Sequence, residues 1–211
     1  MPRHAPAASI GRPKDLVKRQ AILEAAKTLF LKYGFEGSSM DSIALEAGVS
    51  KLTVYNHFHD KETLFVAAVE AHCENQLPSP DFDLKEDSQI EKTLLSIATR
   101  FQSVIYSSEG LELHRLMCGA TKHNPSLVNK FYQAGPARVL NHMTRLLAQA
   151  HQQRKLVVPD NKVAAEHFLS LLSGCLHMRV LFEIEARPTD AELKLLAEKA
   201  VQRFVQAYAY L

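Results

Sequence analysis

Apolar residues recur at helical spacing along most of the chain, and the first such run begins after Asp15. Apolar positions three or four residues apart fall on one face of a helix; here they are Leu16, Ile22, Leu23, Ala26, Leu29 and Phe30. The run stops at Tyr33–Gly34, where glycine can adopt the left-handed conformation that ends a helix. Residues 1–14 are rich in Pro and Ala and have no period, which predicts a flexible arm.

Two short helices separated by a tight turn follow this first helix. Ser39 can cap a helix over residues 40–47, and Ser50 can cap another over residues 51–57. The turn between them contains Gly48, and glycine suits it because a positive φ costs a residue with a Cβ roughly 1 kcal/mol or more. A further helix is expected over residues 61–75.

The rest of the chain shows helical start and stop signals after a Pro-rich acidic loop at 78–87. Ser88 and Thr189 each stand three residues before a glutamate, which is the spacing of a capping box. Gly135–Pro136 should interrupt a helical stretch, because proline lacks the N–H and disfavours α geometry in the preceding residue. The expected helices cover 88–106, 108–121, an interrupted stretch from 124, 159–185 and 189–208.

These elements predict an all-α fold of about nine helices in two domains. We expect a flexible arm over 1–14, a three-helix helix-turn-helix domain over 15–61 and a helical bundle over 62–211. In a helix-turn-helix the second helix of the pair lies in the DNA major groove, and the first crosses the DNA backbone. Val54 and Phe58 lie four residues apart and should face the core. The other side chains of the 51–57 helix should then be exposed.

The net charge is only +2, but its distribution favours a nucleic-acid partner for the N-terminal segment. Residues 1–61 carry nine Lys and Arg against six Asp and Glu, whereas the rest carries sixteen against seventeen. A basic segment attached to a near-neutral body is typical of a phosphate-binding module.

Several classes of protein are disfavoured. No apolar stretch approaches the roughly 18 residues that cross a bilayer, and no apolar segment follows the basic N-terminus. The three cysteines are far apart and show no CxxC spacing, so a reducing, cytoplasmic location is expected, without a membrane partner. GxSxG, phosphate-loop and HExxH patterns are absent, so no enzyme activity, catalytic residue or cofactor is expected. His114 and Cys118 come nearest to metal-ligand spacing, and no metal site is expected.

Residues 34–65 resemble the DNA-binding domain of TetR-family transcriptional regulators. The family pattern stands in this sequence as Gly34-Phe35, Ser38-Ser39, Met40 to Ala44, Gly48-Val49-Ser50, Thr53 to Phe58 and Lys61 to Leu64. This close resemblance covers about a quarter of the chain. The remainder resembles the family in its length and helical pattern.

The resemblance implies roles in DNA binding for particular positions. Leu52 and Thr53 would reach base edges, and Lys51 is a second candidate for a base or phosphate contact. Residues 55–57 would grip phosphates, as would the beginnings of two helices at Ser39 and Lys61. Tyr55 and His57 could instead be ordinary packing residues. The implied DNA-binding set is Ser39, Lys51, Leu52, Thr53, Tyr55, Asn56, His57 and Lys61.

The resemblance also implies an effector pocket and a dimer interface in the larger domain. Pocket candidates, each of which could be core packing instead, are Phe101, Ile105, Leu113, Met117, Phe131, Met143, Leu147, Phe168, Leu172, Cys175 and Met178. Polar groups of a ligand could meet His114, His142, His167, His177 or Arg179. The last two helices carry more than one apolar stripe, which indicates a partner surface unless both stripes are internal to one subunit. The interface candidates are Leu176, Val180, Leu193, Leu196, Ala200, Val201 and Phe204.

The sequence therefore predicts a homodimeric regulator that binds a double-stranded DNA operator. The leading hypothesis is a repressor released from its operator by an unknown small-molecule effector of apolar or amphipathic character. An activator or a ligand-independent regulator of the same family is the first alternative. A helical enzyme with a fortuitous helix-turn-helix, or a protein-interaction module without DNA binding, would be the others.

Overall fold

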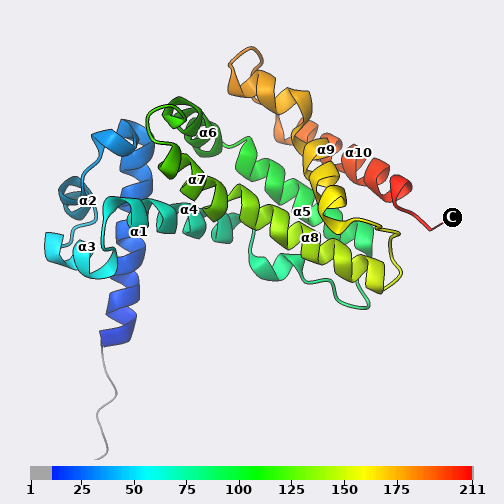
Figure 1. Cartoon of the computed structure of the whole chain (residues 1–211), viewed down its shortest axis with the longest axis horizontal. Helices are drawn as coiled ribbons and strands as arrows, with labels where there is room; N and C mark the ends of the chain where they lie inside the picture. Colours follow the sequence, from blue (N-terminus) through cyan, green and yellow to red (C-terminus); the bar gives the residue numbers. More distant parts are fainter. Residues whose placement is uncertain (1–10, 211) are drawn as a thin grey trace, which may run out of the picture. The chain divides into compact units, whose positions relative to one another are not determined.

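The computed structural model describes residues 11–210, with side chains from residue 14 onward, and they contain helices and no strand. The all-α fold predicted from the sequence is thus confirmed (Figure 1). The chain divides into two compact units after Ala68, within helix α4, Lys61–Gln76. None of the helices in the described range is long and apolar enough to cross a membrane.

The N-terminal unit contains α1, Gly11–Gly37, α2, Met40–Glu46, α3, Lys51–His57, and the first half of α4. Helix α1 begins before Asp15, so residues 11–14 of the predicted arm are helical; residues 1–10 lie outside the described part. A proline at position 13 is compatible with this start, because N–H groups of a first helical turn have no intrahelical acceptor. Gly34, with φ 74° and ψ 173°, interrupts α1 where the sequence predicts its end.

Three phenylalanine rings form the centre of this unit. Phe30, Phe35 and Phe65 lie with ring centroids 5.3–5.7 Å apart, and all three are buried. Phe65 and the buried Leu64 belong to α4. This packing places the beginning of α4 in the N-terminal unit, which is why the boundary falls after Ala68 and not after Lys61 as the sequence predicts.

The two short helices have the caps that the sequence predicts. Ser39 accepts a hydrogen bond from the Ser42 N–H, and the Ser42 side chain completes a capping box. Ser50 caps α3 by accepting from the Thr53 N–H. Gly48, in the turn between them, has φ 64°. The local polar sequence therefore determines where both helices begin.

The C-terminal unit is a helical bundle. Helix α8 packs against α9, and α10 packs against α5 and α9. The core between them contains large buried side chains, including Phe82, Leu94, Met143, Leu147, Phe168 and Phe204. After the 3-10 helix η1, Ser79–Phe82, its elements are α5, Ile90–Ile105, α6, Ser108–Ala120, α7, Pro125–Ala134, α8, Pro136–Gln152, α9, Asn161–Leu181, and α10, Asp190–Ala207.

Helix α9 contains a break that the sequence analysis does not predict. Gly174 has φ 53° and ψ −165°, a conformation open in practice only to glycine. Two residues, one in α5 and one at its C-cap, stabilise the chain just before Gly174. The Gln102 amide donates to the Leu172 carbonyl oxygen at 3.3 Å, and the Tyr106 hydroxyl donates to the Ser173 carbonyl oxygen at 3.0 Å.

Of the two predicted capping boxes, one is present and one is not. Thr189 caps α10 together with Glu192. Helix α5, however, has Gln89 at its N-cap and no side-chain cap, so the predicted role of Ser88 is wrong. The Lys155 ammonium group explains the difference, because it donates to the carbonyl oxygens of residues 85, 86 and 88 at 2.6–3.0 Å. These bonds hold Ser88 in the preceding turn.

This difference can be measured with two matched substitutions. Thr189→Ala should lower the free energy of unfolding by about 1 kcal/mol, because the hydroxyl that accepts from the Glu192 N–H and donates to the Glu192 carboxylate is lost. Ser88→Ala should leave it nearly unchanged. Urea denaturation followed by circular dichroism compares the two. An equal loss in both variants would contradict the assigned helix starts.

Candidate nucleic-acid interface and ligand cavity

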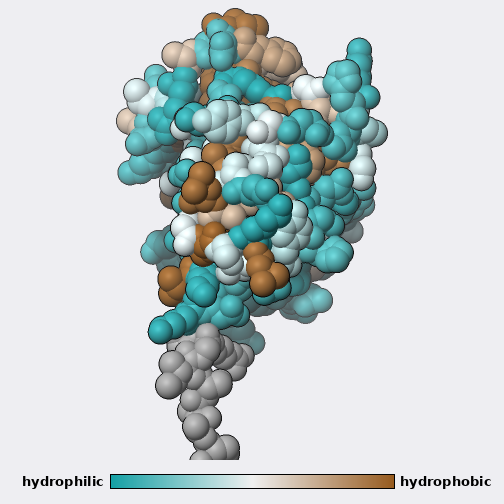
Figure 2. All heavy atoms as spheres, turned by 90° about the vertical axis from the view of Figure 1, so that its left-hand side faces the viewer, coloured by the Kyte–Doolittle hydropathy of each residue, from teal (hydrophilic) through white to brown (hydrophobic). Residues whose placement is uncertain are grey.

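Helix α3 buries one side and exposes the other. Val54 and Phe58 are buried as predicted, whereas Leu52 is 69% and Tyr55 43% exposed. Lys51 and Asn56 are exposed as well. The side of the molecule that carries α2 and α3 is mostly hydrophilic, with isolated apolar side chains (Figure 2). An exposed apolar residue such as Leu52 on a short, basic helix suits contact with base edges and thymine methyl groups.

Thr53 and Lys51 both have polar partners within the protein. The Thr53 and Ser50 hydroxyl oxygens lie 2.8 Å apart and share a hydrogen bond, and Thr53 is half-buried. The Lys51 ammonium group pairs with the Asp41 carboxylate at 2.8 Å, and this hydrogen bond raises the Lys51 pKa. Both members of the pair are well exposed, so the pair contributes little to stability. The predicted phosphate contact of Lys51 would require exchange of this exposed pair.

The remaining predicted DNA contacts are less accessible. His57 Nε2 lies 3.2 Å from the Asp15 carboxylate, and the imidazole is largely covered. The hydroxyl of Ser39 is engaged in the capping box of α2. Both residues can still contact a phosphate at the edge of the interface, but their first role in this structure is to hold α2 and α3 in place.

Lys61 makes contacts within its own chain, and its predicted phosphate contact stays a prediction. Its ammonium group donates to the carbonyl oxygens of Phe35 at 2.7 Å and Ser38 at 3.1 Å, and it lies 4.3 Å from the centre of the Phe35 ring. The side chain is only 24% exposed. Lys61 is therefore a positioning residue that holds the segment between α1 and α2.

The C-terminal unit contains a cavity of about 270 Å³. Four of the predicted pocket residues line it: Phe101, Ile105, Leu113 and Phe131. Two of the predicted polar candidates, His114 and His177, line it as well. Helix α4 supplies three further wall residues that were not predicted, Val69, His72 and Cys73, and Leu77 follows directly after this helix.

The other predicted pocket residues lie elsewhere. Met143, Leu147, Phe168 and Leu172 are packed in the main core, and Met117 is buried outside the cavity wall, whereas Cys175 and Met178 are exposed. Helical periodicity distinguishes buried from exposed positions but does not show which core residues border a void. Among the polar candidates, His142 packs on Phe82, His167 hydrogen-bonds Tyr208, and Arg179 pairs with Glu185.

The titratable groups of the cavity wall are largely uncharged near pH 7. Burial, and secondly the neighbouring His177, lowers the pKa of His114 to about 4. Burial also lowers the pKa of His177, and it raises the pKa of the Cys73 thiol to about 11. His72 is the exception with a charged neighbour, because its ring nitrogen lies 3.7 Å from the Glu109 carboxylate. The cavity thus offers an apolar surface with two neutral imidazoles.

Most of the predicted dimer-interface residues are buried within their own chain. Val180, Leu193, Ala200, Val201 and Phe204 belong to its cores, and Leu176 is half-buried. This corrects their assignment, because a side chain covered by its own subunit cannot face a partner. Leu196 is 37% exposed. Exposed apolar side chains on and next to α9 and α10 that were not predicted include Val163, Leu171, Phe182, Ile184 and Leu195.

The geometry so far, an exposed helix-turn-helix joined to a helical bundle with a cavity, defines a helical DNA-binding regulator. The family model of bacterial regulatory proteins of the tetR family matches residues 22–68. A second model, the C-terminal domain of AefR-like transcriptional repressors, matches residues 92–210, more than half of the chain. The chain therefore belongs to the TetR family of transcriptional regulators, which are DNA-binding proteins and not enzymes.

Individual relatives agree with this assignment. A protein from Mesorhizobium loti MAFF303099 that has been assigned to the TetR family has a crystal structure with a TM-score of 0.79 and 29% identity, covering 93% of this chain and 99% of that one. The flavonoid-responsive regulator FrrA gives a TM-score of 0.70 at 29% identity, over 90% of this chain and 96% of FrrA. The transcriptional regulator YdeS of Bacillus subtilis is 31% identical over 57% of this chain, and the match spans only 58% of YdeS.

The positions on α3 predict two different effects of substitution on DNA binding. Thr53→Ala should change which base is preferred at one operator position, by roughly 1–3 kcal/mol. Tyr55→Ala should weaken binding to all sequences alike, because a phosphate contact carries no sequence information. Fluorescence anisotropy with a set of single-base operator variants measures both.

A stability control accompanies these two variants. Lys61→Met should lower the melting temperature together with DNA affinity, because the two partly buried hydrogen bonds from the ammonium group to carbonyl groups are lost. Tyr55→Ala should leave the melting temperature unchanged, since Tyr55 is exposed. A uniform loss of affinity in Thr53→Ala would show that the base-reading face is misplaced.

Proposed function

We propose that this TetR-family regulator is a repressor that a small molecule releases from its operator. The observation that supports this proposal most directly is the apolar cavity of about 270 Å³ in the C-terminal unit. The description of the matching C-terminal family as a repressor domain supports repression over activation. The printed name of FrrA, a flavonoid-responsive regulator, supports response to a small organic molecule.

Helix α4 provides the physical route from ligand to DNA. Its first half contributes Leu64 and Phe65 to the core of the N-terminal unit, and its second half contributes Val69, His72 and Cys73 to the cavity wall. A ligand that prefers a different position of this wall would shift α4 and hence the helix-turn-helix. A useful switch requires a preference of about 1–3 kcal/mol for the released state.

Contacts within the C-terminal unit hold the end of α4. Arg138 of α8 pairs with the Glu74 carboxylate, which also accepts hydrogen bonds from the Ser79 N–H and hydroxyl at 3.1 Å. The bond from the Ser79 N–H is the main reason why the Glu74 pKa lies below its ordinary value. Since the C-terminal end of α4 is anchored in this way, movement of the cavity wall has to be taken up along the helix.

A reporter assay tests repression and its release. A promoter fusion containing the DNA upstream of the protein's own gene should be more active in a deletion strain than with the gene present. Leu113→Trp should still repress but should no longer respond to conditions that raise expression with the wild-type protein, because the indole ring fills the cavity.

Tyr132→Trp is the matched control, since Tyr132 is exposed on the neighbouring helix α7. It should respond as the wild type does. Lower reporter activity in the deletion strain would instead identify an activator. Normal induction of Leu113→Trp would show that the cavity is not the effector site.

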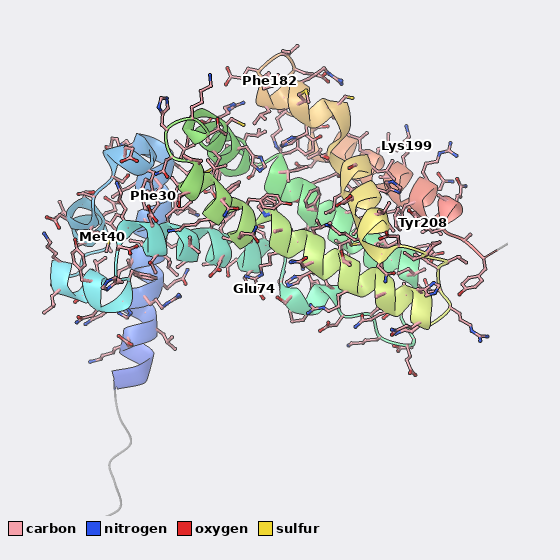
Figure 3. The ribbon with its side chains drawn as sticks, in the orientation of Figure 1. Phe30, Met40, Glu74, Phe182, Lys199 and Tyr208 are labelled. Atoms are coloured by element: carbon pink, nitrogen blue, oxygen red, sulfur yellow. The ribbon has the colours of Figure 1, made fainter. Side chains whose placement is uncertain are left out.

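We also propose that the active form is a homodimer formed through α9 and α10. Phe182, just beyond α9, is 63% exposed, and Leu171, Leu195 and Leu196 add apolar surface to the same two helices. In Figure 3, Phe182 lies at the outer end of α9, and Lys199 lies on α10. A dimer presents two recognition helices to two half-sites about one DNA turn apart. A single short helix makes too few contacts to replace this arrangement.

Charge substitution on this surface tests the dimer. Leu196→Glu combined with Phe182→Glu should convert dimer into monomer in light scattering and abolish tight operator binding, because charged side chains would be buried between the subunits. Tyr132→Glu, at another exposed position, should remain dimeric. An unchanged mass of the double variant would exclude this surface as the dimer interface.

A further inference from the structure

We propose that the cavity of the C-terminal unit takes an uncharged, largely apolar molecule with a hydroxyl group, which His114 and His177 bind by hydrogen bonding. This inference rests on the function proposed above and specifies the chemistry of its effector site. Both residues are in the cavity wall, His114 on α6 and His177 on the last turns of α9.

The two imidazoles lie against each other and between two aromatic rings. Their centroids lie 5.4 Å apart with the rings nearly perpendicular, at 86°. Phe131 lies edge-on to His114 with centroids 5.9 Å apart, and Tyr106 lies edge-on to His177 at 5.5 Å. His177 also makes a hydrogen bond to the backbone of Ile105. This packing places the two rings next to each other in a mostly apolar wall.

Each ring retains hydrogen-bonding capacity that the protein does not use. Nδ1 of His114 and Nε2 of His177 are buried and have no hydrogen-bond partner within the described residues. A buried polar atom without a partner is unfavourable, and native structures rarely tolerate two side by side without a reason. Both atoms are covered by protein, so the rings have to turn before a ligand oxygen reaches them, and such a contact would remove part of this penalty.

The protonation state of the wall favours a hydroxyl over a charged group. A neutral imidazole has one donor and one acceptor nitrogen, and a hydroxyl can match either role. Burial keeps both imidazoles neutral at pH 7. The other titratable lining groups are Cys73, a protonated thiol, and His72, which lies beside Glu109. A carboxylate or ammonium group would thus be buried without a dedicated opposite charge, which is strongly unfavourable.

The volume favours a small organic ligand. The cavity has a volume of about 270 Å³ and is partly open to the surface. A molecule of two fused aromatic rings with one substituent is a suitable first probe. 2-Naphthol meets these criteria and serves as a probe, together with 2-methylnaphthalene and 2-naphthoate, which change only the substituent.

Titration calorimetry of the full chain with the three probes tests the inference. 2-Naphthol should bind about tenfold more tightly than 2-methylnaphthalene, the gain expected from one buried hydrogen bond. 2-Naphthoate should bind more weakly than 2-naphthol. Equal affinities for 2-naphthol and 2-methylnaphthalene, tightest binding of 2-naphthoate, or no binding of any probe would overturn the inference.

Two variants assign the effect to the histidines. His114→Phe and His177→Phe should each reduce the preference for 2-naphthol over 2-methylnaphthalene several-fold while retaining affinity for 2-methylnaphthalene. His142→Phe is the matched control, because His142 packs on Phe82 and does not line the cavity. If a variant fails to fold, as judged by circular dichroism, the wild-type probe ratios still decide.

An operator-binding assay in the presence of each probe separates this inference from the proposed function. Hydroxyl-dependent binding without any effect on operator affinity would leave the inference standing and contradict the proposed release. Release of operator by all three probes alike would support the proposed function and contradict the role of the two histidines.

Discussion

The structure depends on α4 supplying apolar side chains to two separate cores. Phe65 completes a cluster of three aromatic rings with Phe30 and Phe35 in the N-terminal unit. Val69 and Cys73, one and two turns further along, line the cavity of the C-terminal unit. Because packed interiors tolerate little change of volume, the proposed effector would move this helix if it moved the cavity wall. The lysine that opens α4, Lys61, connects it further to the carbonyl groups that precede α2.

The cavity combines an apolar wall with two histidines whose burial keeps them neutral. On the proposed function, such a wall would exclude charged molecules by their desolvation cost and would select by shape and by one hydrogen bond. The break of α9 at Gly174 is part of the same arrangement, since it immediately precedes the segment that carries His177. Tyr106 and Gln102 hold the carbonyl groups before the break, so side chains of α5 and of its C-terminal cap support the wall as well as the core.

Local sequence patterns place the helix caps correctly but do not contain the long-range contacts that decide the role of other residues. The caps Ser39, Ser50 and Thr189 each act on a backbone N–H three residues away, and the structure has all three as predicted. Ser88 has the same local signal as Thr189, yet Lys155, 67 residues further along the chain, holds it in a turn. Lys61 matches a DNA-binding pattern, but its partners Phe35 and Ser38 lie 26 and 23 residues earlier. Their roles depend on contacts that no local pattern contains.

The sequence by itself determined the all-α class, the two short helices of the DNA-binding unit and the exposed face of α3. These features follow from periodicity, caps and one glycine turn, which act over a few residues. Only the tertiary structure decided which apolar residues border a cavity, which are core and which lie on the surface. Met143 and Phe101 are indistinguishable as inward-facing helical residues, but only Phe101 lines the cavity. The physical reason is that a void is a property of several helices packed together, whereas a sequence pattern describes one helix at a time.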